Sequence, residues 1–239
     1  MPATDEAKVT GVMAQAAGVA RGRVEVMARA AALGAGGPGG ASSAQLEWYY
    51  RHVADEDVLT RRPQDLLGAM VSHRRLAQHR PVGTAAVRVL TPAPDRDGWT
   101  SSHTVVEIVT DDMPFLVDSV TAELSRLGRA IHLVVHPQLV VRRDAAGELV
   151  DVVGLPTQPL PYDCYVESWM HLEIDRDTDA QALDQLAADL RRVLGDVRVC
   201  VEDWARMHST ATFLADELVG TPPPGVDGDE VDEAARLLR

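Results

Sequence analysis

The stretch His103-Thr-Val-Val-Glu-Ile-Val-Thr-Asp-Asp-Met-Pro-Phe-Leu-Val-Asp-Ser-Val120 predicts a strand followed by a helix, because its apolar residues change from a strand-like to a helical spacing. The part up to Thr110 is rich in β-branched residues and predicts a strand. The helix that follows is expected to stop at Gly128. A further strand is predicted from Ala130 to Val141, where Pro137 cannot donate to a ladder and therefore indicates an edge strand or a bulge.

The elements on either side of this stretch complete a mixed sheet. A strand is predicted at Thr84–Leu90, a short one at Glu148–Val153, the clearest one at Tyr165–Ile174, and a helix from Thr178 to Gly195. The resulting order, β-β-α-β-β-α, predicts an α+β ferredoxin-like sandwich with both helices on one face of the sheet. No strand is expected after the last helix, so Thr84–Leu90 is expected to form a hairpin with the next strand and fill the vacant edge. The sheet would then be circularly permuted.

Helical segments flank this sheet on both sides. The N-terminal helix has a shallow, Ala-rich stripe and is expected to dock weakly or on a partner. Ser42 or Ser43 is a candidate N-cap for the next helix, and Pro63 suits the first position of another. The last helix, from Asp229, reaches the end of the chain without a cap or breaker, and we expect it to be truncated. The expected segments are 1–33 (helical extension), 34–41 (Gly-rich linker), 42–82 (helical pair), 83–195 (α+β domain), 196–220 (long helix) and 221–239 (linker and start of a truncated element).

The composition excludes several functions. A net charge of −13 argues against a nucleic-acid surface, which needs clustered Lys and Arg. No segment reaches the apolar length of a membrane span, and the acidic N-terminus is not a secretory signal. The only lysine is Lys8, which argues against a lysine base, a Schiff base or a P-loop. Cys164 and Cys200 are too few for a disulfide framework and fit a reducing cytoplasm.

One face of the predicted sheet has no helix to cover it. That face is too apolar and aromatic to stay bare, so we expect it to meet a partner. The candidate interface residues are Val105, His132, Tyr165, Trp169 and His171, together with Val109.

Two motif-like patterns are expected to be structural. His132 and His136 lie four residues apart on one strand, about 13 Å, which is too far for both to hold one metal ion with His171. No metal site is therefore expected. The glycines of 34–39 match a dinucleotide fingerprint in spacing, but a helix precedes them and Pro38 interrupts them, which favours a linker.

Acidic residues surround the predicted start of the central helix. Asp111, Asp112 and Asp118 are candidates to bind the ammonium group of an amino-acid effector. The alternative, which needs no ligand, is that Asp111 and Asp112 cap the helix while Pro114 occupies its first turn.

Several runs resemble known regulatory segments. The strand–turn–helix–strand core from Thr110 to Ile131 resembles ACT regulatory domains. Longer runs are similar to the N-terminal region of the large bacterial NAD-specific glutamate dehydrogenases, and the likeness extends from about Ser42 to Arg239. Those runs are Trp48–Val53, His103–Val109, Asp112–Val120, Glu167–Asp175, Val201–Trp204 and Glu233–Leu238.

The resemblance implies an ACT-like segment that serves regulation and oligomer assembly and carries no catalytic residues. The full protein would oxidise L-glutamate to 2-oxoglutarate and ammonium with NAD, which would bind elsewhere, since Lys8 cannot supply active-site lysines. Its partners would be the rest of its own polypeptide, sister subunits and a candidate amino-acid effector. The alternative is a free-standing ACT-type sensor that binds an amino acid at a dimer interface.

The resemblance also places the candidate effector site at one turn. Phe115 stands where ACT domains commonly have a glycine that lets a ligand approach the backbone. The candidate residues are Asp111, Asp112, Met113, Pro114, Phe115 and Asp118.

Overall fold

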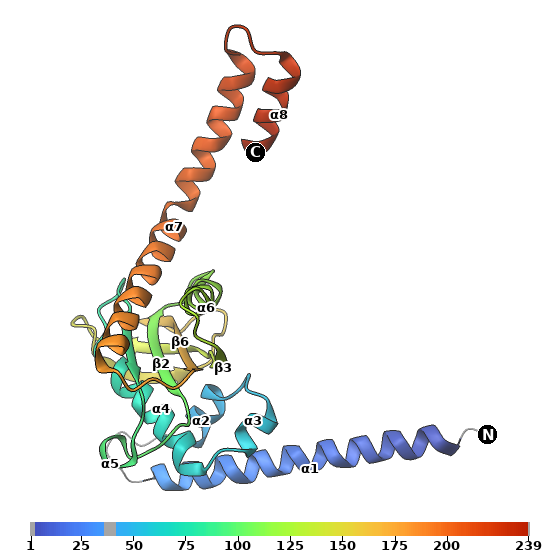
Figure 1. Ribbon diagram of the computed structural model, residues 1–239, viewed down its shortest axis with the longest axis vertical. Helices are drawn as coiled ribbons and strands as arrows, with labels where there is room; N and C mark the ends of the chain where they lie inside the picture. Colours follow the sequence, from blue (N-terminus) through green and yellow to red (C-terminus); the bar gives the residue numbers. More distant parts are fainter. Residues whose placement is uncertain (1–2, 36–41, 239) are drawn as a thin grey trace. The chain divides into compact units, whose positions relative to one another are not determined.

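The computed structural model describes residues 3–35 and 42–238, and the chain divides into two compact units, Met1–Leu194 and Gly195–Arg239 (Figure 1). Residues 36–41 of the predicted linker lie outside the described residues. None of the helices in the described part of the chain is long and apolar enough to cross a membrane.

In the described part of the chain, four helices precede the sheet, and the starts of two of them follow the cap chemistry of the sequence. The side chain of Ser42 accepts a hydrogen bond from the Gln45 N–H at 3.1 Å and completes a capping box, which confirms it as the N-cap. Pro63 opens α4 as predicted. The expected helix from Gln45 to Leu59 is interrupted after Tyr49, so this region holds three helices instead of two. The four are α1 (Ala3–Gly34), α2 (Ser43–Tyr49), α3 (Asp55–Leu59) and α4 (Pro63–Ala77).

The end of α1 belongs to the core of the first unit. Met27 and Ala30 are at most 2% exposed and pack with Tyr49 and Leu46 of α2. Arg23 donates to Tyr50 O at 2.6 Å and to Val53 O at 2.8 Å, two carbonyl oxygens of the segment that connects α2 with α3. The expectation that this helix docks weakly or on a partner is therefore wrong for this end of it, because a few large side chains and an arginine supplement the shallow stripe.

The sheet has six strands in the order β1-β2-β6-β4-β5, with β3 also paired to β6, and every pairing is antiparallel. As expected, β1 forms a hairpin with β2 at one edge. The strand predicted from Ala130 to Val141 is interrupted at His136-Pro137, but β4 lies between β5 and β6 and is not an edge strand. The strands are β1 (Ala86–Leu90), β2 (Thr104–Asp111), β3 (Ile131–Val135), β4 (Gln138–Arg143), β5 (Leu149–Gly154) and β6 (Cys164–Ile174), and a short helix α5 (Pro94–Asp97) lies in the β1–β2 connection.

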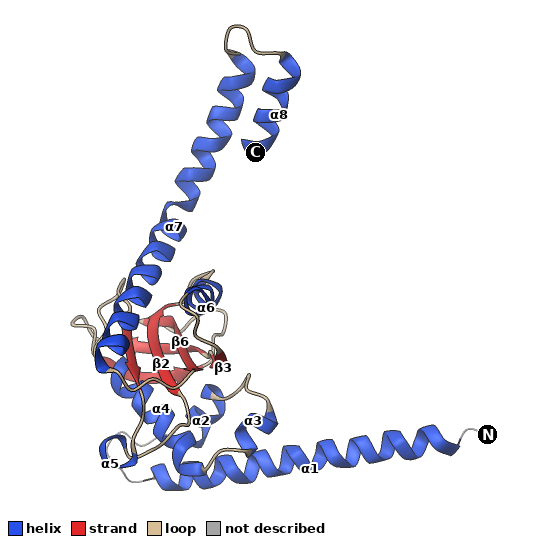
Figure 2. Ribbon diagram, viewed as in Figure 1, coloured by secondary structure: helices blue, strands red, loops and turns tan. Residues whose placement is uncertain are grey.

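Both faces of the sheet are covered (Figure 2). On one face, Trp169 of β6 packs against His73 of α4, with ring centroids 5.1 Å apart. On the other lie α6 (Leu116–Arg126) and the beginning of α7 (Ala180–Gly220), joined by an ion pair between Glu123 and Arg192 at 3.1 Å. The prediction that α6 and the beginning of α7 share one face of the sheet is confirmed. The sequence does not predict that α4, from earlier in the chain, covers the opposite face.

The second unit contains most of α7 and α8 (Gly228–Leu238). We expected α7 to end at Gly195, but the helix runs through that residue, which does not adopt the positive φ of a helix-terminating glycine. Ala215 of α7 and Val231 and Ala235 of α8 are buried, and α8 lies beside the end of α7 (Figure 1).

Candidate functional site at the β2–α6 turn

The turn between β2 and α6 holds the residues that the sequence singled out as an effector site. Asp111 still pairs with Glu167 of β6, and the Asp112 N–H donates to Val166 O at 3.1 Å. The N-cap of α6 is Phe115, which makes no side-chain capping bond. The prediction that Asp111 and Asp112 cap this helix is therefore wrong, because β2 continues through the first of them and the helix starts later.

Phe115 adopts a backbone conformation that favours glycine. Its φ is 69°, in the left-handed region, and its side chain is 64% exposed. For a residue with a Cβ this conformation costs about 1–2 kcal/mol. The backbone thus keeps the glycine-like geometry expected from the resemblance, while the phenyl ring occupies the surface beside it.

The aspartates of the turn are engaged by the chain itself. One oxygen of Asp111 accepts from Arg80 Nη2 at 2.8 Å and the other from the Gly83 N–H at 3.0 Å. Asp112 accepts from Gln138 Nε2 at 2.9 Å. Asp118 is exposed on the first turn of α6. The turn thus brings together all six candidate residues, but two of its three carboxylates already serve as structural acceptors.

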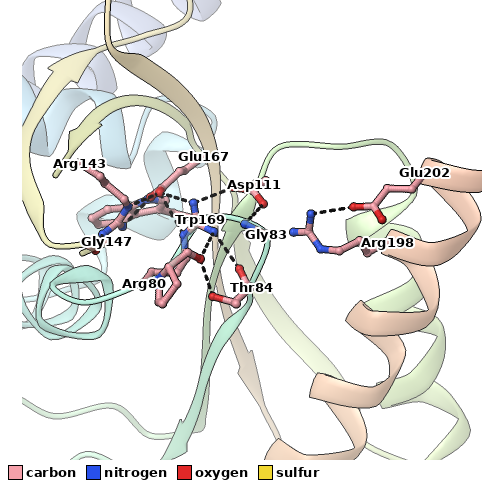
Figure 3. A network of polar contacts seen from close by, with 11 residues as sticks. Arg80, Gly83, Thr84, Asp111, Arg143, Gly147, Glu167, Trp169, Arg198 and Glu202 are labelled. Atoms are coloured by element: carbon pink, nitrogen blue, oxygen red, sulfur yellow. Dashed lines mark hydrogen bonds and ion pairs between the residues drawn. The ribbon is translucent and has the colours of Figure 1, made fainter. Parts of the chain in front are cut away.

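A buried ion network lies directly behind Asp111 (Figure 3). Glu167 of β6, fully buried, accepts from Arg80 Nε at 3.0 Å and from Arg143 Nε at 2.5 Å and Nη2 at 3.0 Å. Trp169 Nε1 donates to the same carboxylate at 3.1 Å. With Asp111, whose side chain is 23% exposed, two carboxylates pair with the two guanidinium groups of Arg80 and Arg143.

The network joins segments that are far apart in the sequence. Arg80 follows α4 and also donates to Thr84 O at 2.8 Å, and Arg143 of β4 donates to Gly147 O at 2.8 Å. Gly147 has a φ of 88°, and a Cβ there would lie 2.8 Å from Arg80 O. This network is not predicted from the sequence. The one signal in the sequence is that Glu167 lies two residues before Trp169 and therefore on the same face of β6.

A second polar cluster lies further along β2 and β6. Arg61 binds Glu173 with two hydrogen bonds, at 2.6 and 2.9 Å. Burial raises the pKa of Glu173, but the imidazole of His171, 3.7 Å away, and the two hydrogen bonds from Arg61 outweigh it and hold that pKa well below its usual range. The carboxylate therefore stays charged although it is 1% exposed.

His73 sits between the helices and the sheet as a neutral imidazole. Burial, with the nearby charge of His171, lowers the pKa of His73 to about 3, although the hydrogen bond to Ile108 O opposes this. The carbonyl can only accept, so Nε2 carries the proton and donates at 3.0 Å. Nδ1 then accepts from the Tyr49 hydroxyl at 2.9 Å.

The predicted interface residues separate into two groups. Val105, Trp169 and His171 are at most 2% exposed, so the prediction that they meet a partner is wrong. They lie on the face that α4 covers. Tyr165 is 44% exposed, and His132 lies at the surface, where it bonds Asp175 at 2.9 Å. A partner contact at these two residues stays a prediction.

The described residues contain no group of three or more His, Cys, Asp or Glu side chains placed to hold a metal ion. His136 bonds Ser168 of β6, and His132 stacks on His103 with ring centroids 4.2 Å apart. These contacts account for the two histidines as structural groups.

Comparison with known proteins identifies the segment. Residues 46–190 match the family model described as "Glutamate dehydrogenase, ACT1 domain". The chain is 38% identical over 192 residues to an NAD-specific glutamate dehydrogenase of Pseudomonas aeruginosa and 36% identical over 191 residues to one of Halomonas elongata. A third relative of the same name, from Mycobacterium tuberculosis, is 29% identical over 174 residues.

The matches cover most of this chain and a small part of each relative. For the first two relatives the aligned region is 80% of this chain and 12% of the relative's length, and for the third it is 73% and 10%. The ACT1 model spans β1–β6, the β2–α6 turn and the ion network. The chain therefore belongs to the NAD-specific glutamate dehydrogenase family, as an N-terminal region that carries the ACT1 domain.

Proposed function

We propose that this chain is a non-catalytic regulatory and assembly segment of a large NAD-dependent glutamate dehydrogenase. The full protein would convert L-glutamate, NAD⁺ and water into 2-oxoglutarate, ammonium and NADH. The observation that carries the proposal is the match of residues 46–190 to the ACT1 domain, within relatives of which the aligned region forms only about a tenth.

The chemistry of the chain supports a non-catalytic role. Lys8 is its only lysine, whereas the resemblance implies active-site lysines for the dehydrogenase. The most strongly held carboxylates, Glu167 and Glu173, are buried against arginines of the same chain. NAD and glutamate would accordingly bind in the rest of the polypeptide, and the free thiols of Cys164 and Cys200 fit a cytoplasmic enzyme.

The segment would have a permuted ferredoxin-like topology. The path from β2 through α6 to β3 passes over β6, which lies between these two strands in the sheet. The hairpin strand β1 takes the edge that a fourth strand usually occupies. This arrangement supports an ACT-like domain whose β2–α6 turn is open to solvent at Pro114 and Phe115.

Within the segment, the aspartates of the β2–α6 turn hold other parts of the chain in place. Arg80 and Gly83 hold Asp111, and Gln138 holds Asp112, which leaves Asp118 as the exposed carboxylate of the turn. An amino-acid effector would therefore have to displace existing bonds to reach the first two aspartates. The alternative function, a free-standing amino-acid sensor, requires this displacement and predicts a saturable thermal shift that Asp112→Ala abolishes.

The size of the native polypeptide tests the proposal. A cell extract is separated by size and blotted with an antibody against residues 42–220. We expect a band many times heavier than 25.8 kDa that co-elutes with glutamate-dependent NAD reduction. A single band near 25.8 kDa would contradict the proposal and favour the free-standing sensor.

A further inference from the structure

The helix α7 carries an unbroken seven-residue repeat. Its apolar residues alternate three- and four-residue steps, which place them at the a and d positions of a heptad. The full series is Leu183, Leu186, Leu190, Val193, Val197, Cys200, Trp204, Met207, Ala211, Leu214 and Leu218. A strict repeat of this kind is typical of a helix that winds around another helix.

The two halves of the repeat differ in burial. Leu186 and Leu190, near the beginning of α7, are at most 4% exposed. Further along, Trp204 is 64% exposed and Met207 and Leu214 are each 45% exposed. We call Cys200, Trp204, Met207, Ala211 and Leu214 the α7 seam. Within the described residues, the seam is an apolar stripe that solvent reaches along most of its length.

The helix α8 does not close the seam. Ala215, at the e position beside it, is fully buried, whereas its neighbour Leu214 stays half exposed. α8 therefore packs on the e side of α7: the a residue Ala211 is partly buried, whereas the d residues Met207 and Leu214 stay exposed. A large contiguous apolar stripe on a helix marks an interaction site.

We propose that the α7 seam binds the same seam of a second copy of this chain, in a parallel, in-register coiled coil. The proposal rests on the assembly part of the proposed function and adds the surface and the partner. The repeat is self-complementary, because each a or d side chain of one copy meets the same layer of the other.

Charge favours the parallel orientation. In a parallel pair, a g residue faces the e′ residue five positions later in the partner. Asp203 at g, which pairs with Arg206 of its own helix, then faces His208 at e′, and Thr210 at g faces Ala215 at e′, so no like charges meet beside the seam. In the antiparallel orientation g positions face g′ positions, which brings Asp203 close to Glu217 of the other copy. The acidic pair would oppose that arrangement.

The α7 seam can be tested on the 239-residue chain itself. Light scattering after size exclusion, over a series of concentrations, should give twice the monomer mass of 25.8 kDa. Met207→Glu with Leu214→Glu should weaken the dimer at least about 100-fold, because four charges, two from each copy, would lose water in the seam. The matched control is Phe213→Glu, since Phe213 is 64% exposed and lies at a c position outside the seam. It should leave the dimer intact.

Cysteine cross-linking tests the orientation without disturbing the fold. Cys200 is exposed and occupies a d position, so the two copies of it should face each other at disulfide distance in a parallel pair. In a Cys164→Ser background, mild oxidation should give a covalent dimer that Cys200→Ser abolishes. A mass of 25.8 kDa at every concentration, a dimer insensitive to the double glutamate variant, or a dimer without the Cys200 link would each overturn the proposal. None of these outcomes bears on the native-size blot, so the two proposals can fail separately.

Discussion

Glu167→Gln should be among the most destabilising single substitutions in the chain that preserve side-chain size. The carboxylate of Glu167 accepts five N–H groups: Oε1 accepts three, from Arg80 and Arg143, and Oε2 accepts two, from Arg143 and Trp169. A glutamine keeps one acceptor oxygen and turns an amide NH₂ toward at least two of these donors. It also removes the carboxylate that pairs with Arg143 and leaves Arg80 paired with Asp111.

The expected cost is roughly 3–5 kcal/mol of the free energy of unfolding, which is typical when one partner of a buried ion pair is removed. Urea unfolding, followed by tryptophan fluorescence and far-UV circular dichroism, measures it. Glu148→Gln is the matched control, because Glu148 is 45% exposed and pairs with His79 at the surface. Its cost should stay below about 1 kcal/mol.

A double variant separates the ion network from general packing. Arg143→Met combined with Glu167→Gln should cost less than the sum of the two single variants, because fewer charges are left unpaired. A loss below about 1 kcal/mol for Glu167→Gln alone, or strictly additive single variants, would refute the role given to this network.

Three further predictions follow from burial and backbone geometry. The unfolded state protonates His73 below about pH 6.5, whereas the folded state does so only near pH 3. The free energy of unfolding should therefore decrease as the pH is lowered from about 6.5 to about 3. The contribution is at most about 5 kcal/mol, and His73→Gln should flatten the measured curve; parallel curves for both proteins would contradict this. Gly68→Ala should destabilise by about 1–3 kcal/mol, because its Cβ would lie 2.3 Å from Trp99 Cβ, whereas Gly195→Ala, with open space, should stabilise by about 0.5–1 kcal/mol in the same urea assay. Equal effects of the two alanines would show that Trp99 yields. Phe115→Gly should raise the thermal midpoint, since it relieves a positive φ on an exposed residue; a lower midpoint would mean that the ring makes a stabilising contact.

Local signals in the sequence predicted the elements well. The change of period within residues 103–120 located β2 and α6, and Ser42 and Pro63 marked the starts of α2 and α4. These features depend on residues within one or two turns of each other. Gly195 shows the limit of such signals, because a glycine with a helical backbone does not end a helix whose apolar repeat continues beyond it.

The candidate site was predicted less well, for a different physical reason. The six residues of the β2–α6 turn do lie together, but the role of Asp111 depends on Arg80. This arginine binds both Asp111, 31 residues away, and Glu167, 87 residues away. Sequence spacing carries no information about such a contact. The same holds for Trp169 and His171, whose face is covered by a helix that comes 90 or more residues earlier in the chain.

Removal of residues 1–239 from the full-length enzyme distinguishes a regulatory and assembly segment from one that takes part in catalysis. Glutamate-dependent NAD reduction and the mass of the assembly are measured on the same samples, before and after removal. A non-catalytic regulatory and assembly segment predicts that the shortened enzyme keeps its chemical activity per subunit while its assembly or its response to amino acids changes. A folded, normally assembled shortened enzyme without any glutamate-dependent NAD reduction would place an essential catalytic group in this segment and contradict the account.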